Sequence, residues 1–226
     1  MGSPSLLSQN LPPLAERVRP QILADYKGQY AIIKEQSLLS NAIKSNQPFS
    51  CILWGPPGTG KTTLSRILSF EFKMDFFQLS ATSSGVKQVR EVLEKGRVAF
   101  ESGNRSILFI DEIHRFSKSQ QDALLHSVED GSIILIGATT ENPSFEVIPP
   151  LLSRCRILRL HPLKNRELDM ILQRALNEDI LLTQKKITFE KKTAELLVKS
   201  CGGDARKLLN TLELAISLHP TGDIKL

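Results

Sequence analysis

The 226-residue sequence has few cysteines, no long apolar run and no recognisable export signal. Its three cysteines, Cys51, Cys155 and Cys201, are far apart and include no C-x-x-C pair, which argues against a disulfide framework or a zinc site. No apolar run approaches the roughly 20 residues that a membrane-spanning helix needs. The first ten residues have neither the basic start nor the apolar centre of a secretory signal. We therefore expect a flexible leader at 1–10, no membrane partner, and an intracellular, cytoplasmic protein with reduced thiols.

The composition has no strong bias either. Hydrophobic residues make up 41% and charged residues 23%, which is typical of soluble globular proteins and argues against wholesale disorder. A net charge of +5 permits a nucleic-acid partner without demonstrating one. The length suits one compact domain with a smaller appendage.

One stretch matches the phosphate-loop pattern G-x-x-x-x-G-K-[ST] in full, namely Gly55-Pro56-Pro57-Gly58-Thr59-Gly60-Lys61-Thr62. Its glycines let backbone N–H groups turn inward toward phosphate oxygens, Lys61 can reach the outer phosphates, and Thr62 can ligate Mg²⁺. The apolar run Cys51–Trp54 predicts a strand before the loop. The helical spacing of Thr63–Phe72 predicts a helix after it, whose N-terminus favours an anion. We therefore predict that this loop, with Thr63 beside it, binds ATP and Mg²⁺.

A second candidate site follows the apolar run Ile107–Ile110, which predicts a strand buried on both faces. The run ends on Asp111 and Glu112. In phosphate-loop ATPases an acidic residue at such a strand end holds Mg²⁺, and an adjacent carboxylate can orient and deprotonate the attacking water. Asp111 would then hold the metal and Glu112 the water. An acidic pair that caps a helix is the alternative interpretation, but the upstream phosphate loop favours the catalytic one.

A third set of polar residues follows the run Ile133–Thr140, which predicts another buried strand. Because open parallel sheets bind ligands at the carboxyl ends of their strands, Trp54, Asp111 and Thr140 should reach one edge. Thr140 or Asn142 could therefore touch the γ-phosphate or its water. For Asn142, formation of a turn before Pro143 is an equal alternative.

Strands that alternate with helices predict an α/β fold with a parallel sheet flanked by helices, followed by a small α-helical lid domain. We expect a nucleotide-binding domain at 11–161 and the lid at 162–226. The first domain should contain, besides the strands above, a helix over 30–45, a strand over 76–79, a helix from 85 to about 100, a capping-box helix over 117–129 and a strand over 157–160. The lid should contain only helices, over 165–178, 189–200 and 204–218.

The segments Phe109–Asp122 and Gly137–Phe145, with Ser153-Arg154-Cys155 and a Gly-Asp-Ala-Arg turn ending at Arg206, resemble one group of proteins. They are similar to the AAA+ ATPases of the clamp-loader-like branch, and within it to the RarA (MgsA) family and its eukaryotic Werner-helicase-interacting relatives. The resemblance covers nearly the whole chain, from about Leu11 to His219. It implies a phosphate-loop AAA+ core.

The resemblance also implies roles for single residues. Asp111 and Glu112 become the Walker B pair, and Thr140 falls where the sensor-1 residue lies, although many relatives carry Asn there and Asn142, two residues later, is the alternative. Arg154 matches the arginine finger that acts on a neighbour's ATP, and Arg206 matches sensor 2; an ordinary surface arginine is the alternative for each. The adenine would be enclosed by a preceding segment, which comprises Val18, Arg19, Pro20, Tyr26 and Gly28.

Finally, the resemblance implies a function. Such proteins act at stalled or damaged replication forks, are stimulated by DNA ends and gaps, associate with single-strand-binding protein and the nucleoid, and form tetramers through a further carboxy-terminal domain. We expect that domain to be absent here, so the chain should be monomeric or weakly associating, with weak ATP hydrolysis.

The sequence contains no recognisable DNA-binding motif: no helix-turn-helix, zinc finger or aromatic stacking platform is visible. Lys87 and Arg90, near the start of a predicted helix, could follow a DNA backbone, although a solvated basic face is the commoner explanation. Three other functions remain open: a clamp-loader subunit, a branch-migration motor of RuvB type, and an ATP-gated scaffold without useful turnover.

Overall fold

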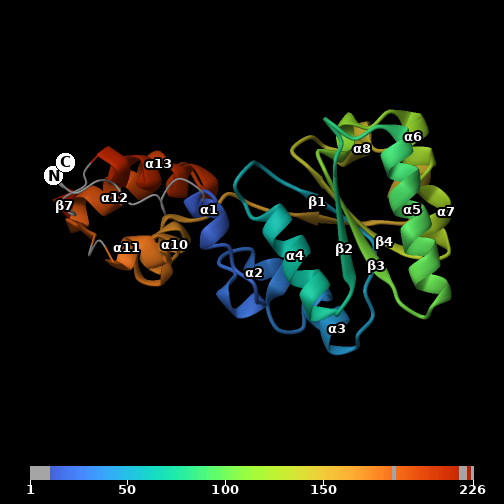
Figure 1. The fold of residues 1–226 in the computed structure, drawn as a ribbon, viewed down its shortest axis with the longest axis horizontal. Coiled ribbons are helices and arrows are strands. Elements are labelled where there is room, and N and C mark those ends of the chain that lie inside the picture. The colour runs from blue at the N-terminus through green and yellow to red at the C-terminus, as the bar shows by residue number, and fades with distance from the viewer. Residues whose placement is uncertain (1–10, 185–186, 219–222, 225–226) are drawn as a thin grey trace. The chain divides into compact units, whose positions relative to one another are not determined.

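The computed structural model describes residues 11–184, 187–218 and 223–224, and these fall into two compact units (Figure 1). The sheet unit runs from Pro20 to Pro162. The helical unit combines residues 11–19 with the described residues from Leu163 onward, and the leader expected at 1–10 lies outside the described residues.

The sheet unit is built on five parallel strands in the order β2-β3-β4-β1-β5. In register, Cys51 of β1 lies between Ile136 of β4 and Arg156 of β5, so an interior strand of the sheet carries the phosphate loop at its carboxyl end. This confirms the predicted α/β fold with a parallel sheet. The strands are β1 (Cys51–Trp54), β2 (Asp75–Ser80), β3 (Ser106–Asp111), β4 (Ile133–Thr139) and β5 (Arg156–Arg159).

The two faces of the sheet bury alternate residues, as the period of a strand requires. Leu53 and Phe109 pack on the side covered by α3 and α4, whereas Ile52 and Leu108 pack on the side covered by α5 and α7 (Figure 1). The helices of this unit are η2 (Leu23–Asp25), α2 (Tyr30–Ile33), α3 (Leu38–Lys44), α4 (Lys61–Glu71), α5 (Val86–Glu101), η3 (Ile113–Arg115), α6 (Lys118–Asp122), α7 (Leu125–Glu129), α8 (Pro143–Glu146) and α9 (Pro149–Leu152).

Two helices predicted as continuous are divided. The helix expected over 30–45 breaks between α2 and α3, because Gln36 adopts a left-handed φ of 64° and the Ser37 hydroxyl caps α3 by accepting from the Ser40 amide at 3.2 Å. The helix expected over 117–129 is α6 followed by α7. Its predicted capping box is confirmed, with Ser117 and Gln120 bonded reciprocally.

The helical unit consists of α1 (Leu14–Arg17), α10 (Asn165–Glu178), α11 (Ile180–Gln184), α12 (Lys191–Ser200) and α13 (Ala205–Leu218). The expectation of helices alone was wrong, because β6 (Thr188–Phe189) pairs in parallel with β7 (Asp223–Ile224). Leu14 and Val18 are buried in the core of this unit among Leu168, Leu208 and Leu212. Residues 11–19 therefore pack with the helical unit, although they were expected in the nucleotide-binding domain.

Arg17 attaches this N-terminal segment to the helices. Its Nε and Nη2 atoms lie 2.7 and 3.2 Å from the two carboxylate oxygens of Asp179, and its Nη1 atom lies 3.0 Å from Glu213 Oε1. Glu213 Oε1 also accepts from the Leu14 amide at 2.9 Å. The Asp179 side chain is only 3% exposed, so this ion pair is largely shielded from water.

Candidate nucleotide-binding site

The phosphate loop joins β1 to α4 and has the backbone that its glycines were expected to allow. Gly58 and Gly60 have left-handed φ values of 68° and 94°. At Gly55 an added Cβ would lie 2.4 Å from the carbonyl oxygen of Leu160, so only glycine fits beside the end of β5. In the described part of the chain, the amides of Gly58 and Gly60 donate to no acceptor. These donors at the start of α4 fit an anionic ligand such as a phosphate.

Lys61 lies inside the curve of this loop. Its Nζ atom donates to the carbonyl oxygens of Gly55 at 2.7 Å and Pro56 at 2.9 Å, and the residue is buried. The Thr59 hydroxyl closes the same turn by donating to the Pro56 carbonyl at 2.9 Å. The loop therefore holds a shielded ammonium group next to its unpaired amides, which is a suitable arrangement for phosphate oxygens.

Residues 26–29, which precede the loop in the sequence, contact both the phosphate loop and the backbone just after β5. The Tyr26 hydroxyl donates to the Thr59 carbonyl at 3.2 Å, and burial raises the Tyr26 pKa, so the phenol stays protonated. The Gln29 amide pairs with the backbone of His161, donating to its carbonyl at 2.7 Å and accepting from its amide at 2.9 Å. Gly28, with a φ of 82°, makes the turn between the two contacts. The segment thus runs past the loop to the end of β5.

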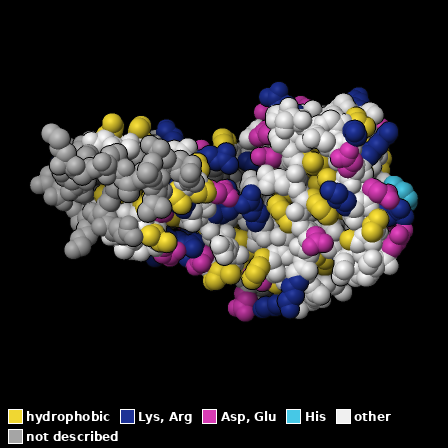
Figure 2. Space-filling view, viewed as in Figure 1, with side chains coloured by type: hydrophobic (Ala, Val, Ile, Leu, Met, Phe, Trp, Pro, Cys, Tyr) yellow, Lys and Arg dark blue, Asp and Glu magenta, His cyan; other side chains and the backbone are white. Residues whose placement is uncertain are grey.

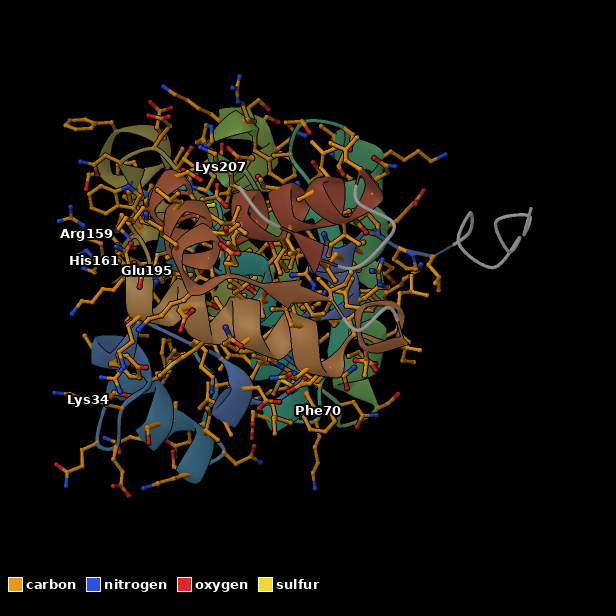
Figure 3. The ribbon with its side chains drawn as sticks, turned by 90° about the vertical axis from the view of Figure 1, so that its left-hand side faces the viewer. Lys34, Phe70, Arg159, His161, Glu195 and Lys207 are labelled. Atoms are coloured by element: carbon orange, nitrogen blue, oxygen red, sulfur yellow. The ribbon has the colours of Figure 1, made fainter. Side chains whose placement is uncertain are left out.

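The edge of the sheet beside this segment is basic. Arg159 lies over the ring of Trp54, with its guanidinium carbon 4.9 Å from the centroid. Figure 3 shows Arg159 and His161 projecting on the same side of the sheet unit. Trp54 thus contacts Arg159, and this cation–π contact connects the last residues of β1 and β5.

The acidic pair lies where it was expected, at the carboxyl end of β3. Asp111 is the last residue of that strand, and Glu112 follows in the left-handed conformation, with φ 55° and ψ 45°. Glu112 Oε2 lies 3.2 Å from His114 Nε2, and His114 Nδ1 lies 2.9 Å from the Thr139 hydroxyl at the end of β4. Helix α4, which begins at Lys61, packs against β3. The loop and the acidic pair therefore belong to neighbouring elements.

The oxygen atoms offered by Thr62 and Asp111 suit a hard cation such as Mg²⁺, which prefers hydroxyl, carboxylate, water and phosphate oxygens. Thr62 lies in the first turn of α4 and Asp111 at the end of β3, and both are half-buried. No group of three or more His, Cys, Asp or Glu side chains that could hold a metal ion occurs among the residues that the structure describes.

Thr140 and Asn142 differ in what their side chains contact. Asn142 Oδ1 accepts from the Ser144 amide at 3.1 Å and so caps α8, which is the turn-forming role considered from the sequence. Thr140 follows β4 directly and is half-buried. The structure thus commits the Asn142 oxygen to its own helix.

The two candidate arginines lie in different units. Arg154 follows α9 at the surface of the sheet unit, where its guanidinium donates to the Pro150 carbonyl at 2.8 Å and pairs with Glu129 at 3.0 Å. Arg206 lies in the first turn of α13 in the helical unit and is exposed. Asp204 caps α13, its carboxylate accepting from the Lys207 amide at 2.9 Å.

The segment expected to enclose adenine is divided between the units. Val18 is buried in the helical core, and Arg19 hydrogen-bonds Glu16 in the same unit. Pro20 begins the sheet unit, which also holds Tyr26 and Gly28.

Three residues at the site were missed from the sequence: Gln29, His114 and Thr139. Each acts through a partner that is distant in sequence or belongs to another strand, which local patterns do not reveal. The position of His114, two residues after Glu112 in a motif already singled out, was the one available signal.

The candidate DNA-contacting residues Lys87 and Arg90 are exposed near the start of α5. The Lys87 side chain is 90% exposed, and its ammonium lies 4.0 Å from Glu91. On the face seen in Figure 2, basic and acidic side chains of the sheet unit are interspersed.

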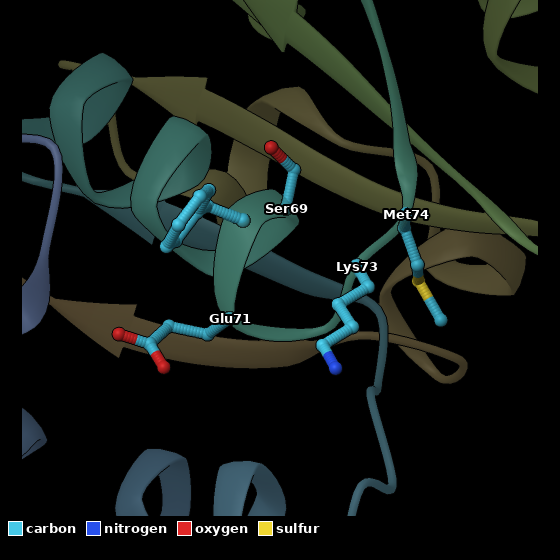
Figure 4. A pocket seen from close by; sticks show the side chains of 5 residues that line it. Ser69, Glu71, Lys73 and Met74 are labelled. Carbon is cyan, nitrogen blue, oxygen red and sulfur yellow. The ribbon is translucent and has the colours of Figure 1, made fainter.

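A shallow hollow of about 470 Å³ lies at the far end of α4 from the phosphate loop. It is lined by Ser69, Phe70, Glu71, Lys73 and Met74 (Figure 4). Because α4 is 11 residues long, about 16 Å separates the two ends. The hollow is therefore separate from the candidate nucleotide site.

No helix of the described ranges is long and apolar enough to cross a membrane.

Comparisons with known proteins agree with this geometry. Residues 51–163, half of the chain, match the ATPase family associated with various cellular activities (AAA). Replication-associated recombination protein A of Escherichia coli K12 is 43% identical over 212 residues, covering 93% of this chain and 47% of that protein. ATPase WRNIP1 of Dictyostelium discoideum is 42% identical over 207 residues, covering 92% and 24%.

Among solved structures, the RuvB Holliday junction branch migration motor of Thermotoga maritima is similar, with a TM-score of 0.73 and 28% identity over 92% of this chain and 70% of that one. The chain spans about half the length of the RarA proteins that it matches. The family match and the parallel sheet that carries the phosphate loop lead to one conclusion: the chain belongs to the AAA family of ATPases, with RarA and WRNIP1 as homologues.

Proposed function

We propose that this chain is the ATP-hydrolysing core of a RarA-like protein that acts on DNA at stalled or damaged replication forks. One observation carries the hydrolase assignment: β1 and β3 of one parallel sheet end in a phosphate loop with a buried lysine and in an acidic pair. Adjacent binding and acidic groups of this kind are what phosphoryl transfer requires.

The proposed roles follow from the geometry. The amides of the loop and the Lys61 ammonium bind the phosphates, and Tyr26 holds the preceding segment, in which Pro20 and Gly28 also lie, against the loop. Thr62 and Asp111 would hold Mg²⁺, which supplies neutralisation of phosphate charge when it is bound. Glu112 orients the attacking water and accepts its proton.

Thr140 is the better candidate for sensing the γ-phosphate, because the Asn142 oxygen already caps α8. We assign Arg154 to a neighbouring subunit's site, since it lies at the surface on a different element from the phosphate loop. Its pair with Glu129 is surface-exposed and worth at most about 1 kcal/mol, so it can open. Arg206 would be the sensor-2 residue.

The DNA-directed part rests on relatives. Proteins named for replication-associated recombination share 43% identity with 93% of this chain. By this analogy the full-length protein would respond to forks, ends or gaps, form a homo-tetramer, and work beside single-strand-binding protein on the nucleoid. The structural similarity to a branch migration motor favours one second candidate, a RuvB-like motor on DNA junctions.

The test is ATP hydrolysis with no DNA, with forked or gapped DNA, and with a four-way junction. It should use this chain, a version extended to the natural carboxy terminus, and Glu112→Gln in each. We expect fork or gap DNA to stimulate the extended protein and Glu112→Gln to abolish that turnover. Preference for the junction would favour the motor. Nucleotide binding without any DNA response would favour a clamp-loader subunit or a scaffold.

A further inference from the structure

Three side chains lie in contact across the carboxyl ends of β3 and β4, one pair joined by a hydrogen bond and the other by a close ion-pair contact. The Thr139 hydroxyl lies 2.9 Å from His114 Nδ1, and His114 Nε2 lies 3.2 Å from Glu112 Oε2. Thr139 is fully buried, the His114 side chain is 8% exposed and the Glu112 side chain is 33% exposed. This series of contacts thus runs from buried Thr139, through His114, to half-exposed Glu112, which is the candidate catalytic carboxylate.

The partners determine the direction of each hydrogen bond. The Glu141 amide donates to Thr139 Oγ1 at 3.0 Å, which leaves the Thr139 hydroxyl proton for His114 Nδ1. The competing contact from Thr139 Oγ1 to the Glu141 carbonyl is longer, at 3.3 Å. With Nδ1 accepting, the proton of a neutral imidazole lies on Nε2, the nitrogen that faces Glu112 Oε2 at 3.2 Å. We assign this tautomer from the Thr139 contact, because it gives the Thr139 hydroxyl an acceptor and places the ring proton next to the Glu112 carboxylate.

Glu112 needs such a partner. Its left-handed backbone starts η3 and turns the side chain out of the run of β3, and a half-exposed glutamate has several rotamers open to it. Of its carboxylate oxygens, Oε2 lies 3.2 Å from His114 Nε2, whereas Oε1 has no partner among the residues that the structure describes. One oxygen is therefore held while the other remains available.

We propose that His114 is a positioning residue for Glu112, and that Thr139 fixes the His114 ring. The inference rests on the proposed role of Glu112 in hydrolysis. Because the Glu141 amide belongs to the loop that begins at Thr140, the orientation of the carboxylate depends on that loop. Contact between Thr140 and a phosphate would then be transmitted to Glu112 through two side chains rather than through the backbone of β3.

Two substitutions of His114 distinguish its contact with Glu112 from its contact with Thr139. The amide nitrogen of His114→Gln can reach the position of Nε2 and so contact Glu112, whereas the amide of His114→Asn lies near Nδ1 and does not reach Glu112. In single-turnover hydrolysis we expect His114→Asn to slow the chemical step by about ten- to a hundredfold, because a misplaced catalytic group costs rate steeply. His114→Gln should recover most of that loss. Nucleotide affinity should change less than about twofold in both, since binding does not involve Glu112.

His126→Asn is the matched control, because its side chain is 90% exposed on α7 and should leave the rate unchanged. Adding His114→Asn to Glu112→Gln should cause no further loss, since both changes remove the same function. Equal loss with Asn and Gln, or no loss with either, would overturn the proposal.

A second readout needs no nucleotide. In protein labelled with ¹⁵N-histidine, the ring nitrogens of His114 should show the Nε2-protonated tautomer, and both Glu112→Gln and Thr139→Val should shift them while His126 stays unchanged. A His114 signal insensitive to both changes would contradict the proposed contacts of His114 with Glu112 and Thr139. If Glu112→Gln leaves hydrolysis intact but shifts the His114 signal, the contact between His114 and Glu112 exists, but the proposed catalytic role of Glu112 is wrong.

Discussion

The hydroxyl of Tyr26 occupies the space that a side chain at Gly60 would need. A Cβ at Gly60 would lie 2.7 Å from the Tyr26 hydroxyl oxygen, and the φ of Gly60 is 94°. Tyr26 and the phosphate loop are therefore packed so closely that a methyl group does not fit at Gly60, and the loop cannot make room for one without displacing Tyr26.

Gly60→Ala should weaken ATP-analogue binding at least about tenfold, because it adds left-handed backbone strain and a clash at the phosphate site. Gly85→Ala is the control, since Gly85 has ordinary φ and open space around its Cβ. Equilibrium binding of a fluorescent ATP analogue measures both. Equal affinity for the two variants would contradict the packing described here.

Arg17→Met should lower the free energy of unfolding of the helical unit by about 2 to 3 kcal/mol, because Asp179 is left buried without its cation. Hydrogen exchange in α10 and α13 with urea unfolding measures the loss. Arg166→Met is the control, since Arg166 is exposed on α10 and substitutions of surface residues usually change stability little. If the two variants are equally stable, Arg17 does not hold the N-terminal segment as the structure indicates.

Lys61→Ala and Arg154→Ala should each be inactive alone, but a mixture of the two should recover part of the ATPase rate. Lys61→Ala subunits cannot bind phosphate productively yet can offer Arg154 to a neighbour, and arginine fingers are worth about 10³ to 10⁵ in rate. The rate of the mixture should rise with protein concentration. A mixture as inactive as its components, at concentrations where subunits associate, would indicate that Arg154 does not act between subunits.

Lys87→Ala combined with Arg90→Ala should reduce the stimulation of ATP hydrolysis by DNA in the extended protein. The slope of DNA affinity against salt concentration should also fall, by the amount expected for the loss of about two phosphate contacts. Lys95→Ala, later on the same helix, provides the control for loss of charge alone. Basal hydrolysis should be unchanged in both variants. If stimulation and its salt slope survive the double substitution, α5 does not contact DNA.

Local patterns predicted the parts of the fold that local forces determine. Cys51–Trp54 and the helix after Gly60 were identified because an apolar run, a glycine-rich loop and a helical period follow one another directly. The bounds of α10 were predicted at both ends for the same reason.

The remaining features depend on contacts that the linear sequence does not order. The break before Ser37 comes from a left-handed residue that is not glycine, and the pairing of β6 with β7 joins segments more than thirty residues apart. The contact of His114 with Thr139 depends on β3 and β4 lying side by side. The burial of Val18 in the helical core was missed for the same reason.

The most direct test of the account is single-turnover ATP hydrolysis by Glu112→Gln beside Glu71→Gln, a matched carboxylate at the far end of α4. We predict that Glu112→Gln binds ATP with unchanged affinity and slows hydrolysis by about 10² to 10⁴, while Glu71→Gln resembles the unmodified chain. If Glu112→Gln hydrolyses ATP at the unmodified rate, the acidic pair at the end of β3 is not the catalytic centre.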